Sequence, residues 1–110
     1  MEKEPKPVRY STQFKQDVID VYIYGLETFG KVQAERYQDN IYRLVERLDV
    51  FYSIYPECRH LPTKSKMYRW IILESHLIIY RIIVTEIQVL RIVHSHRSIT
   101  KIRASRRVKL

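Results

Sequence analysis

The chain has 110 residues, the length of one small domain, and its 20 basic and 12 acidic residues give a formal charge of +8. Its lone Cys58 excludes an internal disulfide, and its two glycines leave no glycine-rich phosphate-binding loop. The charged N-terminus, with Pro5 and Pro7, is unlike a secretory signal peptide, so we expect a cytoplasmic protein. Seven basic residues and no acidic one lie in 91–110, so the excess positive charge is at the C-terminal end.

The N-terminal part predicts a short strand followed by a helix. Residues 1–6 are expected to form a loose arm, and residues 8–10 alternate between apolar and polar like a strand. Ser11 or Thr12 offers a helix N-cap. The apolar residues that follow are three or four apart and share one helical face: Phe14, Val18, Val21, Gly25 and Phe29. Gly30 is expected to end this helix, because glycine tolerates a left-handed conformation.

A second helix is predicted after a junction at Gly30 and Lys31. Its apolar residues repeat every seven positions in two series, Ala34, Ile41 and Leu48, and Tyr37, Leu44 and Phe51. Charged residues between them form an exposed face. A coiled coil also fits this repeat, but the stripe is short, and packing into a core is the favoured interpretation. Two helices joined at Gly30 and Lys31 therefore predict an antiparallel hairpin.

The C-terminal half predicts a sheet. Beyond a loop at 53–66, three segments are rich in the residues that favour strands, namely 68–73, 76–84 and 87–93, with turns at Glu74-Ser75 and Thr85-Glu86. Charged residues interrupt 71–93 about every five positions, which excludes a membrane helix.

Both faces of this sheet are expected to be mostly apolar. Alternation puts His76, Ile78, Tyr80 and Ile82 on one face of their strand and Leu77, Ile79, Arg81 and Ile83 on the other face. In the last strand it puts Leu90, Ile92 and His94 on one face and Val89, Arg91 and Val93 on the other. Such faces leave little room for an open polar active site. We therefore expect the hairpin to cover one face, and either the tail or a partner segment to cover the other.

The predicted fold class is α+β, in which a helical hairpin packs on a small, mostly antiparallel sheet in the order β-α-α-β-β-β. We expect a single domain over 1–97 and a basic C-terminal segment over 98–110. That segment can form a last helix, with Ile102 and Val108 as its few apolar residues.

Several local motifs accompany this order of elements. They are Val8-Arg9-Tyr10-Ser11 before the hairpin, Tyr55-Pro56 and Leu61-Pro62 in the loop, Tyr68-Arg69, His76-Leu77-Ile78-Ile79-Tyr80-Arg81 and Leu90-Arg91-Ile92-Val93-His94. Together they resemble the RelE/ParE superfamily of bacterial toxins from type II toxin–antitoxin systems, over about residues 8–97. The last two motifs are most similar to the ParE branch.

The resemblance implies one of two activities. RelE-like toxins cleave mRNA on the ribosome, and the matching residues here are Arg81 and Arg91 to hold the phosphate and His94 as general acid or base. However, Leu77 and Ser95 stand where the nucleases often have a basic residue and a tyrosine. ParE-like toxins bind DNA gyrase without altering it chemically, and this pattern fits the sequence better. We therefore predict a gyrase inhibitor that a cognate antitoxin neutralises in a toxin–antitoxin hetero-oligomer. The resemblance also implies that a partner segment covering the second sheet face would come from this antitoxin.

The expected target-binding residues are the basic ones of the C-terminal end: Arg97, Lys101, Arg103, Arg106 and Arg107. Ribosome and mRNA are the partners in the nuclease alternative, and the basic tail alone also fits a non-toxic protein that binds nucleic acid. We expect no membrane partner, cofactor or metal. His94 and His96 share one side of a strand, but a zinc site would need a third ligand from Cys58 or His60, and histidines at a strand end are more often surface residues.

Overall fold

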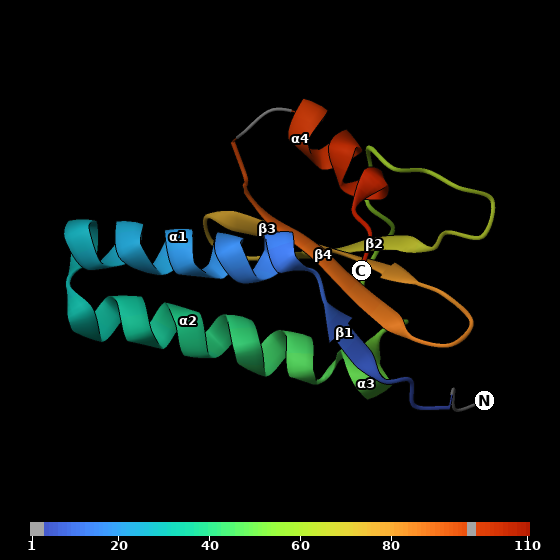
Figure 1. The fold of residues 1–110 in the computed structure, drawn as a ribbon, viewed down its shortest axis with the longest axis horizontal. Helices are drawn as coiled ribbons and strands as arrows, with labels where there is room; N and C mark the ends of the chain where they lie inside the picture. The colour runs from blue at the N-terminus through green and yellow to red at the C-terminus, as the bar shows by residue number, and fades with distance from the viewer. Residues whose placement is uncertain (1–3, 97–98) are drawn as a thin grey trace.

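A helical hairpin lies on one face of a four-stranded sheet, and a short C-terminal helix lies on the other (Figure 1). The computed structural model describes residues 4–96 and 99–110. Its elements are β1 (Val8–Tyr10), α1 (Thr12–Phe29), α2 (Lys31–Glu46), α3 (Leu48–Phe51), β2 (Tyr68–Ile72), β3 (His76–Ile82), β4 (Ile87–His94), α4 (Ile99–Ala104) and a 3-10 turn, η1 (Ser105–Arg107). The predicted α+β fold is confirmed.

The sheet is mixed and mostly antiparallel, with strand order β1-β4-β3-β2. The central strands β3 and β4 are antiparallel and run from the His76–His94 pair to the Ile82–Ile87 pair. The strand β2 lies antiparallel to β3, and β1 lies parallel to β4 with Val8 opposite Ile87. Because β1 and β4 are parallel, the hairpin and the rest of the sheet form the long crossover that such a pair needs.

A β-bulge in β4 changes which residues face the hairpin. Ile79 lies opposite Arg91 and Tyr80 opposite Val89, so Leu90 is an extra residue in the strand. The bulge puts Val89 and Ile92 in the core on the hairpin side, and Leu90 and Val93 in the cluster on the other side. The prediction that Leu90 shares a face with Ile92, and Val89 with Val93, is therefore wrong, since it assumed unbroken alternation.

Local hydrogen bonds and backbone angles fix the ends of the hairpin helices. Ser11 is the N-cap of α1, because its Oγ accepts the Phe14 N–H at 2.8 Å and donates to the Leu90 carbonyl at 2.6 Å. Gly30 alone links the helices, with φ at +90°, and α2 begins at Lys31 instead of after it. Nearby, a Cβ built on Gly25 would lie 3.3 Å from the Ala34 Cβ, so this glycine lets α1 and α2 approach closely.

Two predicted apolar positions lie outside the core. The second helix breaks at Arg47, and the seven-residue repeat does not continue through α3: Leu48 is buried, but Phe51 is 40% exposed. Phe29, at the far end of α1, is 61% exposed because the Gly30 end of the hairpin extends past the sheet (Figure 1). The core on this face instead joins the sheet-proximal residues Phe14, Val18, Ile41, Val45, Leu48 and Tyr52 to Ile71, Ile78, Tyr80, Ile87, Val89 and Ile92.

The connections of the sheet are close to those predicted. The turn at Glu74-Ser75 is confirmed, whereas the next turn is centred on Val84-Thr85 and not on Thr85-Glu86, because the Ile83 N–H donates to the Glu86 carbonyl. Residues 4–6 of the expected loose arm are tied to the body: the Lys6 N–H donates to the Asp49 carbonyl, and Tyr52 donates to the Glu4 carbonyl. None of the helices that the structure describes has the length and apolar content of a membrane span.

Candidate target-binding surface

The C-terminal segment, residues 99–110, covers the sheet face opposite the hairpin (Figure 1). Ile102, Ser105 and Val108 are buried, and their spacing of three places them on one side of the tight helical turns. Ile102 and Val108 join a second apolar cluster that includes Cys58, Leu61, Leu77, Ile79, Leu90 and Val93. The chain's own tail, one of the two covers that we expected, therefore closes this face.

The outer side of the same segment is basic. The predicted target-binding residues Lys101, Arg103, Arg106 and Arg107 are all exposed, whereas Arg97 lies outside the described residues. No acidic residue occurs in 91–110, so the side chains of this part of the chain sum to a positive charge. A folded, charged surface of this kind suits recognition of an acidic partner.

A groove runs between this segment and the loop that precedes β2. It encloses about 380 Å³ and is lined by His60, Leu61, Pro62, Thr63, Tyr68, Arg103 and Arg106. None of these lining residues is acidic. The two arginines border the groove, so the basic surface has a concave part in which an acidic side chain of a partner can be held by charge-assisted hydrogen bonds.

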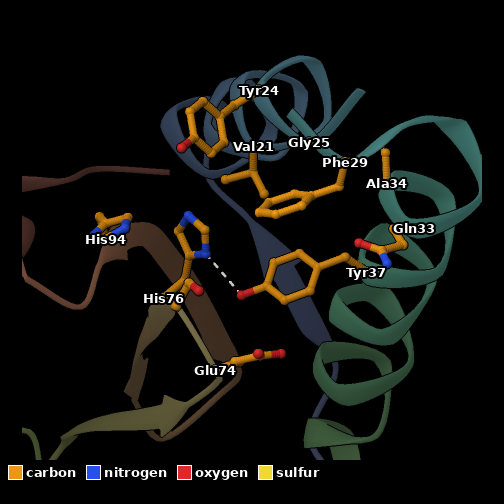
Figure 2. Close-up of a pocket in the computed structure, with 11 residues that line it drawn as sticks. Val21, Tyr24, Gly25, Phe29, Gln33, Ala34, Tyr37, Glu74, His76 and His94 are labelled. Atoms are coloured by element: carbon orange, nitrogen blue, oxygen red, sulfur yellow. Dashed lines mark hydrogen bonds between the residues drawn. The ribbon is translucent and has the colours of Figure 1, made fainter. Parts of the chain in front are cut away.

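A second hollow of about 240 Å³ lies between the far half of the hairpin and the adjacent ends of β3 and β4. Figure 2 shows Tyr37 pointing from α2 towards His76, and the Tyr37 hydroxyl and His76 Nδ1 are hydrogen-bonded at 2.8 Å. Burial, and then the nearby His94, lower the pKa of His76, while burial raises the pKa of Tyr37. At neutral pH this arrangement is an uncharged polar contact in a mostly apolar hollow.

The candidate nuclease residues do not form one site. His94 lies opposite His76 and Arg81 opposite Gln88, and His76 and Arg81 are five residues apart on β3, about 17 Å in an extended strand. Arg81 donates to the carbonyls of Arg106 and Val108, and Arg91 is paired with Asp17. Both guanidinium groups are thus bound inside the protein instead of being directed at a common phosphate position.

Asp17 is a residue that the sequence did not single out. Its carboxylate accepts from Arg91 Nε at 2.7 Å and Nη2 at 3.0 Å, and also from the Ile92 N–H at 2.9 Å. The side-chain hydrogen bond to Asp17 raises the pKa of Arg91. Since β1 ends opposite Val89, this carboxylate caps the edge of β4 where its neighbouring strand stops. In the sequence, the feature that could have pointed to Asp17 is its place directly before the buried Val18.

The residues considered for a metal site lie in different surroundings. The rings of His94 and His96 are 5.6 Å apart between centroids, and His94 Nδ1 accepts the His96 N–H. Cys58 is buried in the second cluster, where burial raises the pKa of its thiol, and His60 packs edge-on against Trp70. Within residues 4–96 and 99–110, no group of three or more His, Cys, Asp or Glu side chains is placed to hold a metal ion.

Residues 8–99 match the family model described as the ParE toxin of the type II toxin–antitoxin system, parDE. The chain belongs to the ParE toxin family. The predicted ParE branch of the superfamily is therefore confirmed. The fold of this ParE family member is also similar to a solved structure titled "Chromosomal ParDE TA system from P. aeruginosa", with a TM-score of 0.68 and 19% sequence identity, covering 84% of this chain and 98% of that chain. No curated protein matches the chain.

Proposed function

We propose that this ParE family toxin inhibits DNA gyrase by binding it through the C-terminal segment, and that a cognate antitoxin neutralises it. The observation that supports this most is the amphipathic packing of the segment. Ile102 and Val108 are buried against the sheet, and the basic residues Lys101, Arg103, Arg106 and Arg107 are left exposed on its outer side. A basic surface that is held on a folded support is suited to binding a protein with an acidic surface.

Binding accounts for the geometry better than mRNA cleavage does. An endonuclease must stabilise the charge that develops on the scissile phosphate next to a general acid or base. Here the guanidinium groups of Arg81 and Arg91 hold other parts of the protein, and His94 is about five strand residues from Arg81. The gyrase-binding proposal requires no such cluster.

The surface of α1 supports docking of an antitoxin. Ile19, Ile23 and Leu26 are exposed and lie four and three residues apart, so they form an apolar stripe along the helix. The tail already covers the second sheet face, which was our expected place for the antitoxin. We therefore propose this stripe as the antitoxin-docking surface, because exposed apolar side chains that gather on one face indicate a protein interface.

A supercoiling assay with purified toxin and DNA gyrase tests the proposal. We expect supercoiling to stop at stoichiometric toxin and to resume when the antitoxin encoded next to the toxin gene is added. Unchanged supercoiling at a large molar excess of toxin would contradict the proposal.

Mapping of mRNA 5′ ends on stalled ribosomes tests the nuclease alternative, because gyrase inhibition predicts no new codon-specific cuts. The third alternative, a non-toxic protein that binds nucleic acid, predicts strongly salt-dependent binding to bare DNA or RNA and no growth arrest on expression.

A further inference from the structure

The guanidinium group of Arg81 joins the sheet to the C-terminal segment. Its Nη2 donates to the Val108 carbonyl at 2.9 Å, and its Nη1 donates to the Arg106 carbonyl at 3.3 Å. On the sheet side, Nε and Nη2 donate to Gln88 Oε1 at 2.8 and 2.6 Å. The guanidinium carbon lies 5.8 Å from the centre of the Tyr68 ring, so the group is held from β2, β4 and the tail at once.

The chemistry of this contact favours arginine. Arginine offers five N–H donors in a planar fork, so it can bind Gln88 and two backbone carbonyls in fixed directions. The carbonyls at the end of a helical turn have no partner within the turn, and Arg81 supplies one for Arg106 and Val108. A lysine would provide a single ammonium without this fork.

Apolar packing also attaches the segment to the sheet. Ile102 and Val108 are buried in the second cluster, and Leu110 packs against that cluster. The Ser105 hydroxyl bonds within the segment, to the Lys101 carbonyl at 3.2 Å. Apolar contacts are non-directional, so they favour burial of the segment without fixing its orientation. The directional bonds of Arg81 are placed to fix it.

We propose that Arg81 is a positioning residue for target binding: it anchors the C-terminal segment to the sheet, so that the basic side chains of that segment form one fixed surface. Without this anchor the segment is docked for only part of the time. The apparent affinity for the target then falls in proportion to the docked fraction, although every target-contacting residue is still present. A test by gyrase inhibition rests on the proposed function, whereas a test of how firmly the segment is held to the sheet does not.

Two variants and one control test the proposal. Arg81→Met keeps the aliphatic stem and removes the donors, and Arg81→Lys keeps the charge and removes the fork. Arg43→Met is the control, because it removes the same charge from the exposed side of α2. Far-UV circular dichroism confirms that each variant is folded, and Arg81→Lys remains informative if Arg81→Met does not fold.

The docking readout is hydrogen exchange of the backbone amides in 101–108. We expect exchange there to be about tenfold faster or more in Arg81→Met, intermediate in Arg81→Lys and unchanged in Arg43→Met. Amides of β3 and β4 should remain protected in all three variants. Wild-type protection of 101–108 in Arg81→Met would overturn the proposal.

The second readout is the toxin concentration that halves gyrase supercoiling. We expect it to rise by about tenfold in Arg81→Met and less in Arg81→Lys, while the inhibition at saturating toxin reaches the wild-type plateau. Faster exchange in 101–108 with unchanged potency would overturn the positioning role. If wild-type toxin does not inhibit gyrase, the proposed function fails, and the exchange rates still decide whether Arg81 anchors the segment.

Discussion

Replacement of Asp17 by asparagine tests whether the Asp17–Arg91 pair holds α1 to the edge of β4. The carboxylate accepts two bonds from Arg91 and one from the Ile92 N–H, and the two side chains are 28% (Arg91) and 11% (Asp17) exposed. Asparagine keeps the shape but loses the negative charge and one acceptor oxygen. A hydrogen bond to a charged group contributes about 1.5–3 kcal/mol, and partial exposure reduces this through screening. We therefore expect Asp17→Asn to lower the free energy of unfolding by about 2 kcal/mol.

Urea unfolding followed by far-UV circular dichroism measures this change. Asp20→Asn is the matched control on α1, since the Asp20 carboxylate is exposed and accepts a bond from Gln16 at 3.0 Å. Its effect should stay within about 0.5 kcal/mol. Adding Arg91→Met to Asp17→Asn should cost less than Arg91→Met alone, because the charge that it removes is already unpaired. A loss below about 0.5 kcal/mol for Asp17→Asn would refute the assigned role of the pair.

Three further predictions concern the polar hollow and the helix ends. Burial and His94 lower the pKa of His76, so the folded state resists protonation of this side chain. The free energy of unfolding should therefore be highest above about pH 6.5 and fall below it, by at most about 1.4 kcal/mol per pH unit. In urea unfolding between about pH 7.5 and 5, His76→Gln should make the midpoint depend less on pH. Gly30→Ala should cost about 1–2 kcal/mol in urea unfolding because φ is +90°, with no clash involved, and an unchanged midpoint would contradict this. Ser11→Ala should cost about 1–2 kcal/mol through loss of the N-cap and of the bond to Leu90, and thermal unfolding would show no shift if the cap were unimportant.

The elements that depend on local patterns could be predicted from the sequence. The strands were found from their apolar and β-branched residues, and Ser11 and Gly30 marked the two ends of α1. Ile102 and Val108 were identified as the apolar residues of the tail, and both are buried. In each case the signal lies within a few residues along the chain, which is the range over which periodicity and capping act.

The features that depend on distant pairing could not be predicted. The extra residue Leu90 is defined only by its register against Ile79 and Tyr80 on another strand. Asp17 and Arg91 are 74 positions apart, and Arg81 meets the Val108 carbonyl 27 positions away. Both arginines therefore looked like phosphate-binding residues in the sequence, whereas the fold gives each an internal partner.

The surface that the fold leaves open to a partner also differs from the surface expected from the sequence. Both sheet faces were correctly predicted to be apolar, and the second face was assigned to either the tail or an antitoxin. The burial of Ile102 and Val108 shows that the tail covers the second face. The exposed apolar residues of α1 do not belong to the predicted core face: Ile19 directly follows the core residue Val18, and Ile23 lies between Tyr22 and Tyr24.

Reversing the charge of the exposed arginines on the C-terminal segment tests directly whether this segment binds gyrase. The variant carries Arg103→Glu, Arg106→Glu and Arg107→Glu, and the control carries three matched reversals on the exposed side of α2: Lys31→Glu, Arg36→Glu and Arg43→Glu. Both are titrated into a gyrase supercoiling reaction beside the wild type. We expect the C-terminal variant to lose about tenfold or more in potency and the α2 variant to inhibit gyrase as well as the wild type does. Equal inhibition by the C-terminal variant and the wild type would contradict gyrase binding through the C-terminal segment.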